Sequence, residues 1–376
     1  MTATTYQPGE IRGLIKINAS KCKGCDACKQ FCPTHAINGA SGAAHSIDED
    51  KCLSCGQCLI NCPFSAIEET HSALETVIKK LADKNTTVVG IIAPAVRVAI
   101  GEEFGLGTGE LVTGKLYGAM NQAGFKIFDC NFAADLTIME EGSEFIHRLH
   151  ANVKGEENAG ALPQFTSCCP GWVRYLETRY PALLPNLSTA KSPQQMAGTV
   201  AKTYGAKVYQ MQPENIFTVS VMPCTSKKLE ASRPEFNSAW QYHQEHGANT
   251  PSYQDIDAVL TTREMAQLLK LLDIDLANTA EYQGDSLFSE YTGAGTIFGT
   301  TGGVMEAALR TAHKVLTGAE MAKLEFEPVR GLKGVKSASV SLFDTQLKQN
   351  VTVNVAVVHD MGNNIEPVLR DVMAGT

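Results

Sequence analysis

Two runs of four cysteines with the same internal spacing lie near the start of the chain. The pattern C-x-x-C-x-x-C-x-x-x-C-P begins at Cys22 and again at Cys52. Thiolates at this spacing bind four-iron cubanes, each taking three cysteines from one run and the fourth from the other. A zinc-binding alternative explains neither the doubled spacing nor the proline after each run. The crossed rule predicts two ligand sets: Cys22, Cys25, Cys28 and Cys62 for one cubane, and Cys52, Cys55, Cys58 and Cys32 for the other.

The segment around these cysteines, from about residue 13 to residue 69, resembles a two-cluster bacterial ferredoxin. A unit of this size cannot be held by its apolar core alone, so the two clusters would act as its staples. Two adjacent cubanes in one small domain form a path for single electrons. We therefore expect an α+β ferredoxin-like domain, with a linker helix, over residues 1–80.

A second group of chemically capable residues begins at the adjacent cysteines of Phe165-Thr-Ser-Cys-Cys-Pro-Gly-Trp172. Adjacent thiols do not easily close on each other, and the Pro-Gly turn would present both from one tight loop. This geometry suits a cluster ligand beside a reactive thiol, whereas an isolated pair would more often be structural and buried. Further on, Met222-Pro-Cys-Thr-Ser-Lys-Lys-Leu-Glu230 places a cysteine, a lysine and a glutamate where a β-rich run meets a helix.

Together these two stretches resemble the first two signature loops of the iron-only hydrogenases, the enzymes that carry a six-iron H-cluster. The resemblance extends over nearly the whole chain, and residues 293–308 are similar to the glycine-rich stretch ahead of the family's third loop. The third loop itself, a glutamate and a methionine followed by Cys-x-x-x-Cys and glycines, is not found before Thr376. The resemblance implies an H-cluster domain over residues 81–376 that stops ahead of this loop. Another chain would then supply the loop, the sequence would be partial, or the protein would transfer electrons without hydrogen chemistry.

The resemblance implies a role for each matching residue. Cys169 and Cys224 would bind the cubane part of the H-cluster, and Cys168 would donate and accept protons beside its two-iron part. A thiol suits that work because its pKa can be tuned toward the working pH. Lys227 would donate a hydrogen bond to a cyanide ligand of the two-iron part. Five further residues would line the pocket: Ala93, Pro94, Gln194, Met222 and Phe298.

Two pairs of charged residues have helical spacing. Glu141 and Glu144 are three apart, which suits a proton hop between carboxylates, although such a pair is more often a solvated helix face. Lys227 and Glu230 have the same spacing, and without the resemblance we would interpret them as a surface ion pair. The resemblance implies that protons reach Cys168 through Glu141, Glu144, Ser188 and Glu230.

The composition is that of an ordinary globular protein of 376 residues, with 44% apolar and 19% charged residues. A net charge of −8 without long like-charge blocks argues against a nucleic-acid partner. No run of eighteen apolar residues and no secretory leader is found, so we expect no membrane span and a cytoplasmic protein. Clustering of the twelve cysteines fits metal binding better than disulfides. Cys130 stands apart, and we interpret it as a core cysteine rather than a substitute ligand.

The elements that must position the second group alternate between β-type runs and helical patterns. A charged stretch at residues 74–83 has apolar spacing of three and four and predicts a helix between the two domains. The alternation predicts an α/β domain with a mostly parallel sheet, whose sites form at strand ends. No dinucleotide spacing is found, so we expect no flavin or nicotinamide site. The predicted strands are 87–92, 125–128, 217–221, 256–260 and 351–358, and the predicted helices are 114–122, 194–204 and 263–272.

Two functions are consistent with these residues. The first is an iron-only hydrogenase catalytic subunit, which interconverts hydrogen with protons and electrons and relays electrons through two ferredoxin-type clusters. The alternative is a noncatalytic iron–sulfur subunit, for electron transfer or sensing, with an empty or cubane-only pocket. The expected partners are an electron carrier or iron–sulfur subunits, which could link the chain to a formate dehydrogenase or a nicotinamide-linked flavoprotein.

Overall fold

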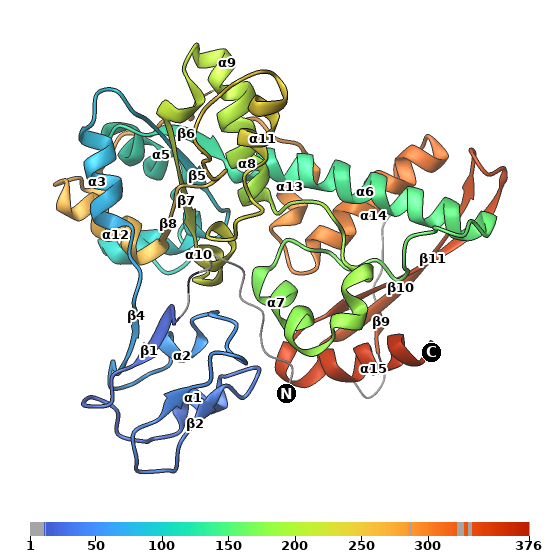
Figure 1. Cartoon of the computed structure of the whole chain (residues 1–376), viewed down its shortest axis with the longest axis horizontal. Coiled ribbons are helices and arrows are strands. Elements are labelled where there is room, and N and C mark those ends of the chain that lie inside the picture. The colour runs from blue at the N-terminus through green and yellow to red at the C-terminus, as the bar shows by residue number, and fades with distance from the viewer. Residues whose placement is uncertain (1–10, 12, 286–287, 322–326, 330–332, 376) are drawn as a thin grey trace.

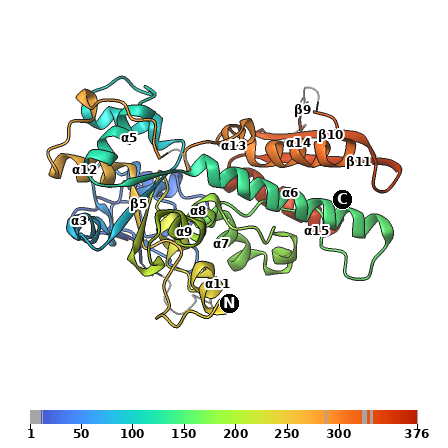
Figure 2. The same cartoon turned by 90° about the horizontal axis from the view of Figure 1, so that it is seen from above.

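The computed structural model describes residues 11, 13–285, 288–321, 327–329 and 333–375. The described chain forms a small N-terminal domain, a lobe built on a parallel sheet and a lobe built on an antiparallel hairpin (Figure 1). Helix α6 (Cys130–Lys154) runs from the first lobe to the second, as the view from above also shows (Figure 2). None of the described helices is both long and apolar enough to cross a membrane.

The N-terminal domain repeats one small unit twice, in line with the doubled cysteine pattern. In each unit the third cysteine lies in a one-turn helix, α1 (Ala27–Gln30) or α2 (Gln57–Ile60). Asp26 and Gly56, which precede these helices, have positive φ angles and turn the chain sharply between two cysteines. The strands pair antiparallel: β1 (Ile15–Ile17) with β4 (Ile67–Glu69), and β2 (Ile37–Asn38) with β3 (Ser46–Ile47).

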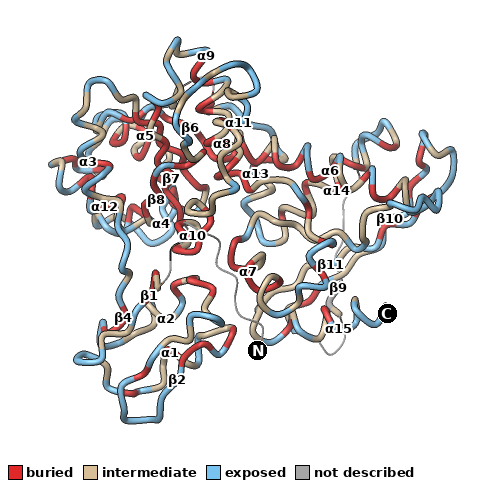
Figure 3. Tube along the Cα trace, in the orientation of Figure 1, coloured by how far each residue is buried: buried red, intermediate tan, exposed pale blue. Residues whose placement is uncertain are grey.

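A four-stranded parallel sheet forms the core of the first lobe, in the order β6-β5-β7-β8. Its strands are short apolar runs that are almost wholly buried, because helices pack around them (Figure 3). A Cβ at Gly90 would lie 2.4 Å from Met120, so this glycine lets a helix pack closely on the sheet. The predicted α/β fold is confirmed. The strands are β5 (Thr87–Ile92), β6 (Lys126–Asp129), β7 (Ile216–Met222) and β8 (Ala258–Thr261), and the neighbouring helices include α3 (Leu74–Ala82), α5 (Thr113–Gln122), α8 (Pro193–Val200) and α12 (Thr262–Leu271).

One predicted strand lies elsewhere. Residues 351–358 were expected in the parallel sheet but belong to β11 (Gln349–Val358), which pairs antiparallel with β10 (Val335–Asp344). Only four residues separate the two strands, too few for the crossover that a parallel pair needs, so the chain can return only as a hairpin. The predicted helix at 194–204 is also interrupted, because α8 continues as a π-helical turn, η3 (Ala201–Gly205).

The second lobe packs this hairpin against helices. Strand β9 (Glu327–Pro328) adds a short third strand beside β10. Helices α6 and α14 (Gly303–Thr317) contact each other, and their apolar side chains meet those of the hairpin in one core. Below them lie α7 (Pro170–Arg179) and α15 (Glu366–Ala374), whose buried residues share a core with Leu53 of the N-terminal domain (Figure 1).

The remaining helical elements are short. Several of them adjoin loops that carry the site residues. They are α4 (Val96–Ala99), α9 (Ala206–Tyr209), α10 (Ser226–Ala231), α11 (Ser238–Glu245), α13 (Gly293–Phe298), the 3-10 turns η1 (Ile100–Phe104), η2 (Pro181–Asn186), η4 (Pro213–Asn215) and η5 (Leu276–Asn278), and the π-helical turn η6 (Met361–Ile365).

Candidate functional site

The structure gathers the N-terminal cysteines in two groups of four. Cys62, from the second run, lines one small hollow together with three cysteines of the first run. Backbone N–H groups point at several sulfurs: Ala66 N lies 3.3 Å from Cys62 Sγ, and His45 N lies 3.5 Å from Cys22 Sγ. Such donors stabilise thiolates that bind a cluster. The first group is Cys22, Cys25, Cys28 and Cys62.

The second group lies between the first group and the rest of the chain. The pKa of Cys58 is raised to about 12. Burial is the main cause, and the neighbouring thiols of Cys52, Cys55 and Cys32 contribute to the rise. Burial also raises the pKa of Cys55 to about 11. Thiolates crowded together away from water require a cationic centre among them, which is the chemistry of a metal-binding donor set. Both groupings therefore fit four-iron cubanes with crossed ligands.

The second cysteine run is docked on the loop that carries Cys224. Thr225 Oγ1 donates a hydrogen bond to the carbonyl of Ser54, and Ser226 Oγ donates to the carbonyl of Leu53 at 2.7 Å. The thiols of Cys55 and Cys224 are close enough to raise the pKa of Cys55 electrostatically. The donor set of the second cubane is therefore next to the pocket cysteines.

The pocket cysteines lie at two helix starts. Cys169 precedes α7, whose first residue is Pro170, and Cys224 lies between the end of β7 and the start of α10, the strand-to-helix junction expected from the sequence. Cys169 is exposed by surface area, yet burial raises the pKa of its thiol. The Cys169 thiol is thus accessible to a bound group although neighbouring atoms desolvate it, and the Cys224 thiol acts electrostatically on it. Two thiols placed in this way fit the ligands of a further cluster.

Lys227 is held beside the adjacent cysteines. Its Nζ donates to the carbonyl oxygen of Cys168 and to Glu230 Oε2, both at 2.9 Å. Burial alone would lower the pKa of Lys227, but the Glu230 carboxylate raises it, so the ammonium stays charged. Burial raises the pKa of Cys168 to about 12, so its thiol holds its proton at neutral pH. The pocket thus combines a fixed cation with a protonated thiol.

A buried network fixes the orientation of Gln194 as well. Its Nε2 donates to Glu230 Oε2 at 2.9 Å, and its Oε1 accepts from Ser220 Oγ at 2.8 Å. Ser192 Oγ is a third donor to Glu230 Oε2, also at 2.9 Å. Glu230 therefore lies with Lys227 and Gln194, and none of the described hydrogen bonds joins it to Ser188.

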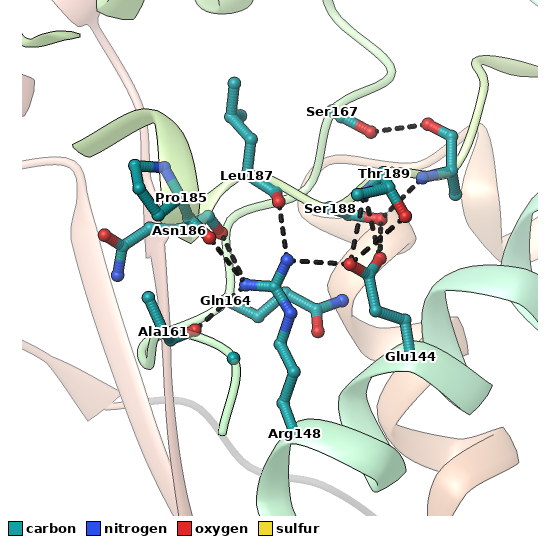
Figure 4. Close-up of polar contacts among 12 residues, drawn as sticks. Glu144, Arg148, Ala161, Gln164, Ser167, Pro185, Asn186, Leu187, Ser188 and Thr189 are labelled. Atoms are coloured by element: carbon teal, nitrogen blue, oxygen red, sulfur yellow. Dashed lines mark hydrogen bonds and ion pairs between the residues drawn. The ribbon is translucent and has the colours of Figure 1, made fainter. Parts of the chain in front are cut away.

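A second polar line leads toward Cys168 from the other side. Its outer part, with Glu144 and Ser188, is drawn in Figure 4. Ser188 Oγ donates to Glu144 Oε2 at 2.7 Å, and the Ser188 hydroxyl also lies near enough to the Glu141 carboxyl to act on its pKa. Glu141 Oε1 accepts from the backbone N–H of Ser167 at 3.1 Å, directly before Cys168. The structure thus brings Glu144, Ser188 and Glu141 together in that order.

The pKa values of the two carboxyls on this line are shifted in opposite directions. Burial raises the pKa of Glu141 to about 7. Burial opposes ionisation of Glu144 too, but hydrogen bonds from Ser188 and Arg148 lower its pKa. Arg148 Nη2 lies 2.7 Å from Glu144 Oε1, and its other bonds go to carbonyls of Ala161, Pro185 and Leu187 (Figure 4). A carboxyl titrating near neutrality at the inner end suits a proton carrier.

The pocket-lining residues predicted from the sequence fall on several elements. Ala93 and Pro94 follow β5, and a Cβ at Gly299 would lie 3.2 Å from Pro94, which places the end of α13 beside that turn. Phe298 is the last residue of α13, and Met222 is the buried last residue of β7. Because β5 and β7 are parallel neighbours, Ala93, Pro94 and Met222 lie at the same edge of the sheet, the edge at which a strand-end site is predicted.

Sequence reasoning missed two contributors. Arg148 is four residues after Glu144, and that spacing could have indicated the ion pair. Ser167 was overlooked although it precedes Cys168.

Cys130, the first residue of α6, lies in the main apolar core, as the sequence predicted. Burial raises the pKa of its thiol to about 12, and the charges of Lys227 and Glu230 also act on it. This part of the core therefore adjoins the pocket, which no local sequence signal reveals.

Comparison with known proteins places these features in context. Residues 86–376 match the family described as iron only hydrogenase large subunit, C-terminal domain, and residues 21–66 match a 4Fe-4S dicluster domain. The periplasmic [Fe] hydrogenase large subunit of Nitratidesulfovibrio vulgaris is 48% identical over 363 residues, which cover 96% of this chain and 80% of that protein.

In two further similar proteins, the matched region is a smaller share of the protein's own length. The NADP-reducing hydrogenase subunit HndD of Solidesulfovibrio fructosivorans is 46% identical over 294 residues, which cover 78% of this chain and 47% of that protein. A variant of apo [FeFe]-hydrogenase HydA1 from Chlamydomonas reinhardtii has a similar solved structure, with a TM-score of 0.69 and 36% identity, covering 81% of this chain and 79% of that one.

Proposed function

The chain belongs to the iron-only hydrogenase large-subunit family, and from that premise we propose how its residues serve the interconversion of hydrogen with protons and electrons. It carries a 4Fe-4S dicluster domain and the H-cluster-binding domain of the family. When bound, the H-cluster supplies the metal centre at which hydrogen is formed or split. The chain's own residues hold that cluster, deliver electrons and move protons.

With its clusters bound, the N-terminal domain would carry electrons along one path, between its outer end and the pocket. The cysteine group that contains Cys62 lies outermost, and the group that contains Cys55 lies against the loop of Cys224. The hydrogen bonds from Thr225 and Ser226 to the backbone of residues 53–54 keep this contact short. Crossed ligation ties the two cubanes into one rigid unit, so single electrons can reach the pocket without a mobile carrier.

Protons pass along the line from Glu144 through Ser188 to Glu141, and from there past Ser167 to Cys168. The raised pKa of Glu141 is the observation that carries this proposal, because a buried carboxyl titrating near pH 7 can both take and release a proton. Cys168, protonated at neutral pH, donates its proton into the pocket and recovers one from Glu141. Glu230 fixes Lys227 and Gln194 and is a positioning residue rather than a step of this line.

The alternative, a noncatalytic iron–sulfur subunit with a cubane-only pocket, rests on a count of ligands. Cys169 and Cys224 are the described pocket cysteines at helix starts, and a cubane takes four ligands. The two proposals differ in what the pocket holds when the protein is matured. Infrared spectra of the matured protein, with bands from iron-bound carbon monoxide and cyanide, together with hydrogen evolution, would establish the hydrogenase. An iron-loaded protein with neither property would establish the alternative.

The partners are iron–sulfur or redox subunits of a larger complex. The name of HndD, a subunit of an NADP-reducing hydrogenase, supports assembly with other subunits. A flavoprotein and a formate dehydrogenase are the partners we propose. We also propose a cytoplasmic location, although the relative from Nitratidesulfovibrio vulgaris is named periplasmic. Co-purification from the native cell, followed by mass spectrometry, tests both points.

A further inference from the structure

A cavity of about 170 Å³ lies beside the proton line, between the loop at residues 187–192, the start of α7 and the end of α10. Thr189 and Glu235 at its rim are exposed. Ser188, Ser192 and Glu230 at its inner end are 6%, 3% and 4% exposed. About 15 Å³ suffices for one water molecule, so this cavity has room for several beside polar partners. It leads from the surface to buried hydroxyls and a buried carboxylate.

Glu230 has hydrogen-bonding capacity left on the side of this cavity. A carboxylate can accept about four hydrogen bonds over its two oxygens. Ser192, Gln194 and Lys227 all bond to Oε2, and none of the described hydrogen bonds reaches Oε1. Because Glu230 also lines the cavity, its free oxygen can accept hydrogen bonds from water there.

Ser188 lines the same cavity while bonding to Glu144. The cavity therefore touches the proton line at its middle, downstream of Glu144 and upstream of Glu141. The described residues contain no direct hydrogen bond between Ser188 and Glu230, so water would have to bridge them. Such a bridge would reach Glu141 without using Glu144.

Charged groups around the cavity are mostly neutralised. Lys191 pairs with Asp255, and Arg233 pairs with Glu177 and with Glu235 at the rim. Lys227 faces Glu230 from the pocket side. Glu230 is thus a buried carboxylate whose Oε1 is left for cavity water, and the cations Lys191 and Arg233 at the cavity have carboxylate partners of their own.

From these contacts we propose that the cavity is a water-holding second proton entrance, in which Glu230 collects protons and water passes them to Ser188. This inference rests on the proposed function. A proton from solvent binds Glu230 Oε1 and moves through cavity water to Ser188 Oγ, while Ser188 releases its own proton to Glu141. Glu230, the water and Ser188 end with the number of protons they had at the start, Glu141 gains the one proton taken from solvent and can pass it on toward Cys168, and no electron moves.

The test removes the first entrance and then changes only the width of the second. Glu144→Gln closes the Glu144 branch, so residual hydrogen turnover must pass through the cavity. Val173 lines the cavity on α7 and makes none of the contacts of the proton line. In the Glu144→Gln background, Val173→Phe should lower the residual turnover roughly 10²-fold, the lower end of the range for loss of a proton-transfer step. Val173→Ala, which widens the cavity, should leave that turnover equal or higher.

If the Val173 substitutions acted by damaging the structure, the two variants should lower turnover alike, because both disturb α7. If Val173→Phe and Val173→Ala lower residual turnover equally, or if neither changes it, the second entrance is refuted. A high-resolution crystal structure gives a readout that needs no turnover: ordered waters should bridge Ser188 and Glu230 and be displaced in Val173→Phe. Their absence refutes the inference even if the protein is a hydrogenase. Bridging water without turnover in any variant supports the water path and contradicts the proposed function instead.

Discussion

The hydroxyl of Ser188 donates to Glu144, with its Oγ 2.7 Å from Glu144 Oε2, and it also lies near enough to Glu141, on the same helix, to act on the pKa of that carboxyl. Ser188→Ala removes the carrier between them, so proton delivery should slow. We expect hydrogen turnover to fall about 10²-fold, with unchanged iron content, as is usual when a positioned proton-transfer group is lost. Thr189→Val is the matched control, because Thr189 Oγ1 also donates to Glu144 but does not reach Glu141. Equal losses in both variants would show that the line does not depend on Ser188.

The buried carboxyl of Glu141 should make stability depend on pH. Its pKa is raised by burial from the model-compound value of 4.5 to about 7, so the folded chain binds this proton more tightly than the unfolded chain. Above the unfolded pKa, the cost of keeping Glu141 protonated in the folded chain lowers the free energy of unfolding. This cost is absent below about pH 4.5, grows as pH rises to about 7, and is complete above it. Glu141→Gln should remove this cost and so raise the free energy of unfolding by at most about 3 kcal/mol at pH 8. At pH 5 the increase should be much smaller.

Urea unfolding of the cluster-loaded protein at pH 5 and pH 8, under anaerobic conditions, measures this difference. Glu140→Gln is the control, because Glu140 is the exposed neighbour on the same helix. A stability difference for Glu141→Gln that stays constant across this range would contradict the raised pKa.

The sequence predicted the elements with the strongest patterns and missed those decided by tertiary contacts. The run Thr87–Ile92 is apolar throughout and bounded by turn residues, and β5 has the same limits. The run that became β11 alternates valine with polar or small residues, which is typical of a half-exposed antiparallel strand, and that alternation should have outweighed its apolar content. Its partner β10 is rich in serine and was not recognised as a strand.

The candidate site shows the same division. Spacing alone grouped the eight N-terminal cysteines, because their ligand geometry is local. The position of Glu230 depends on Ser192 and Gln194, which are distant in sequence, so the predicted path through Glu230 could not be separated from a positioning role. Likewise, only the fold brings Cys130 within the field of Lys227.

Crossed ligation predicts which cluster a single cysteine affects. Cys32 acts electrostatically on Cys52, Cys55 and Cys58 rather than on its neighbours in its own run. Cys32→Ser should therefore damage the cubane nearer the pocket, and electron paramagnetic resonance of the reduced protein should lose that signal. The matched control, Cys28→Ser, should damage the outer cubane. If Cys32→Ser removes the outer signal instead, the two ligand sets are not crossed.

The adjacent cysteines should respond differently to the same substitution, because they face different partners. The Cys169 thiol is electrostatically coupled to Cys224, whereas the Cys168 thiol is coupled most strongly to Glu141. Cys169→Ser should therefore lose the iron of the pocket. Cys168→Ser should keep that iron and the infrared bands of the pocket, but lose about 10² to 10⁴ in turnover, the usual range for a proton-transfer step. A serine hydroxyl remains able to hydrogen-bond but transfers protons less readily than a thiol, so the loss should be smaller than in Cys168→Ala. Equal loss of iron in Cys168→Ser and Cys169→Ser would refute the division of roles, and unchanged turnover in Cys168→Ser would show that protons reach the pocket without that thiol.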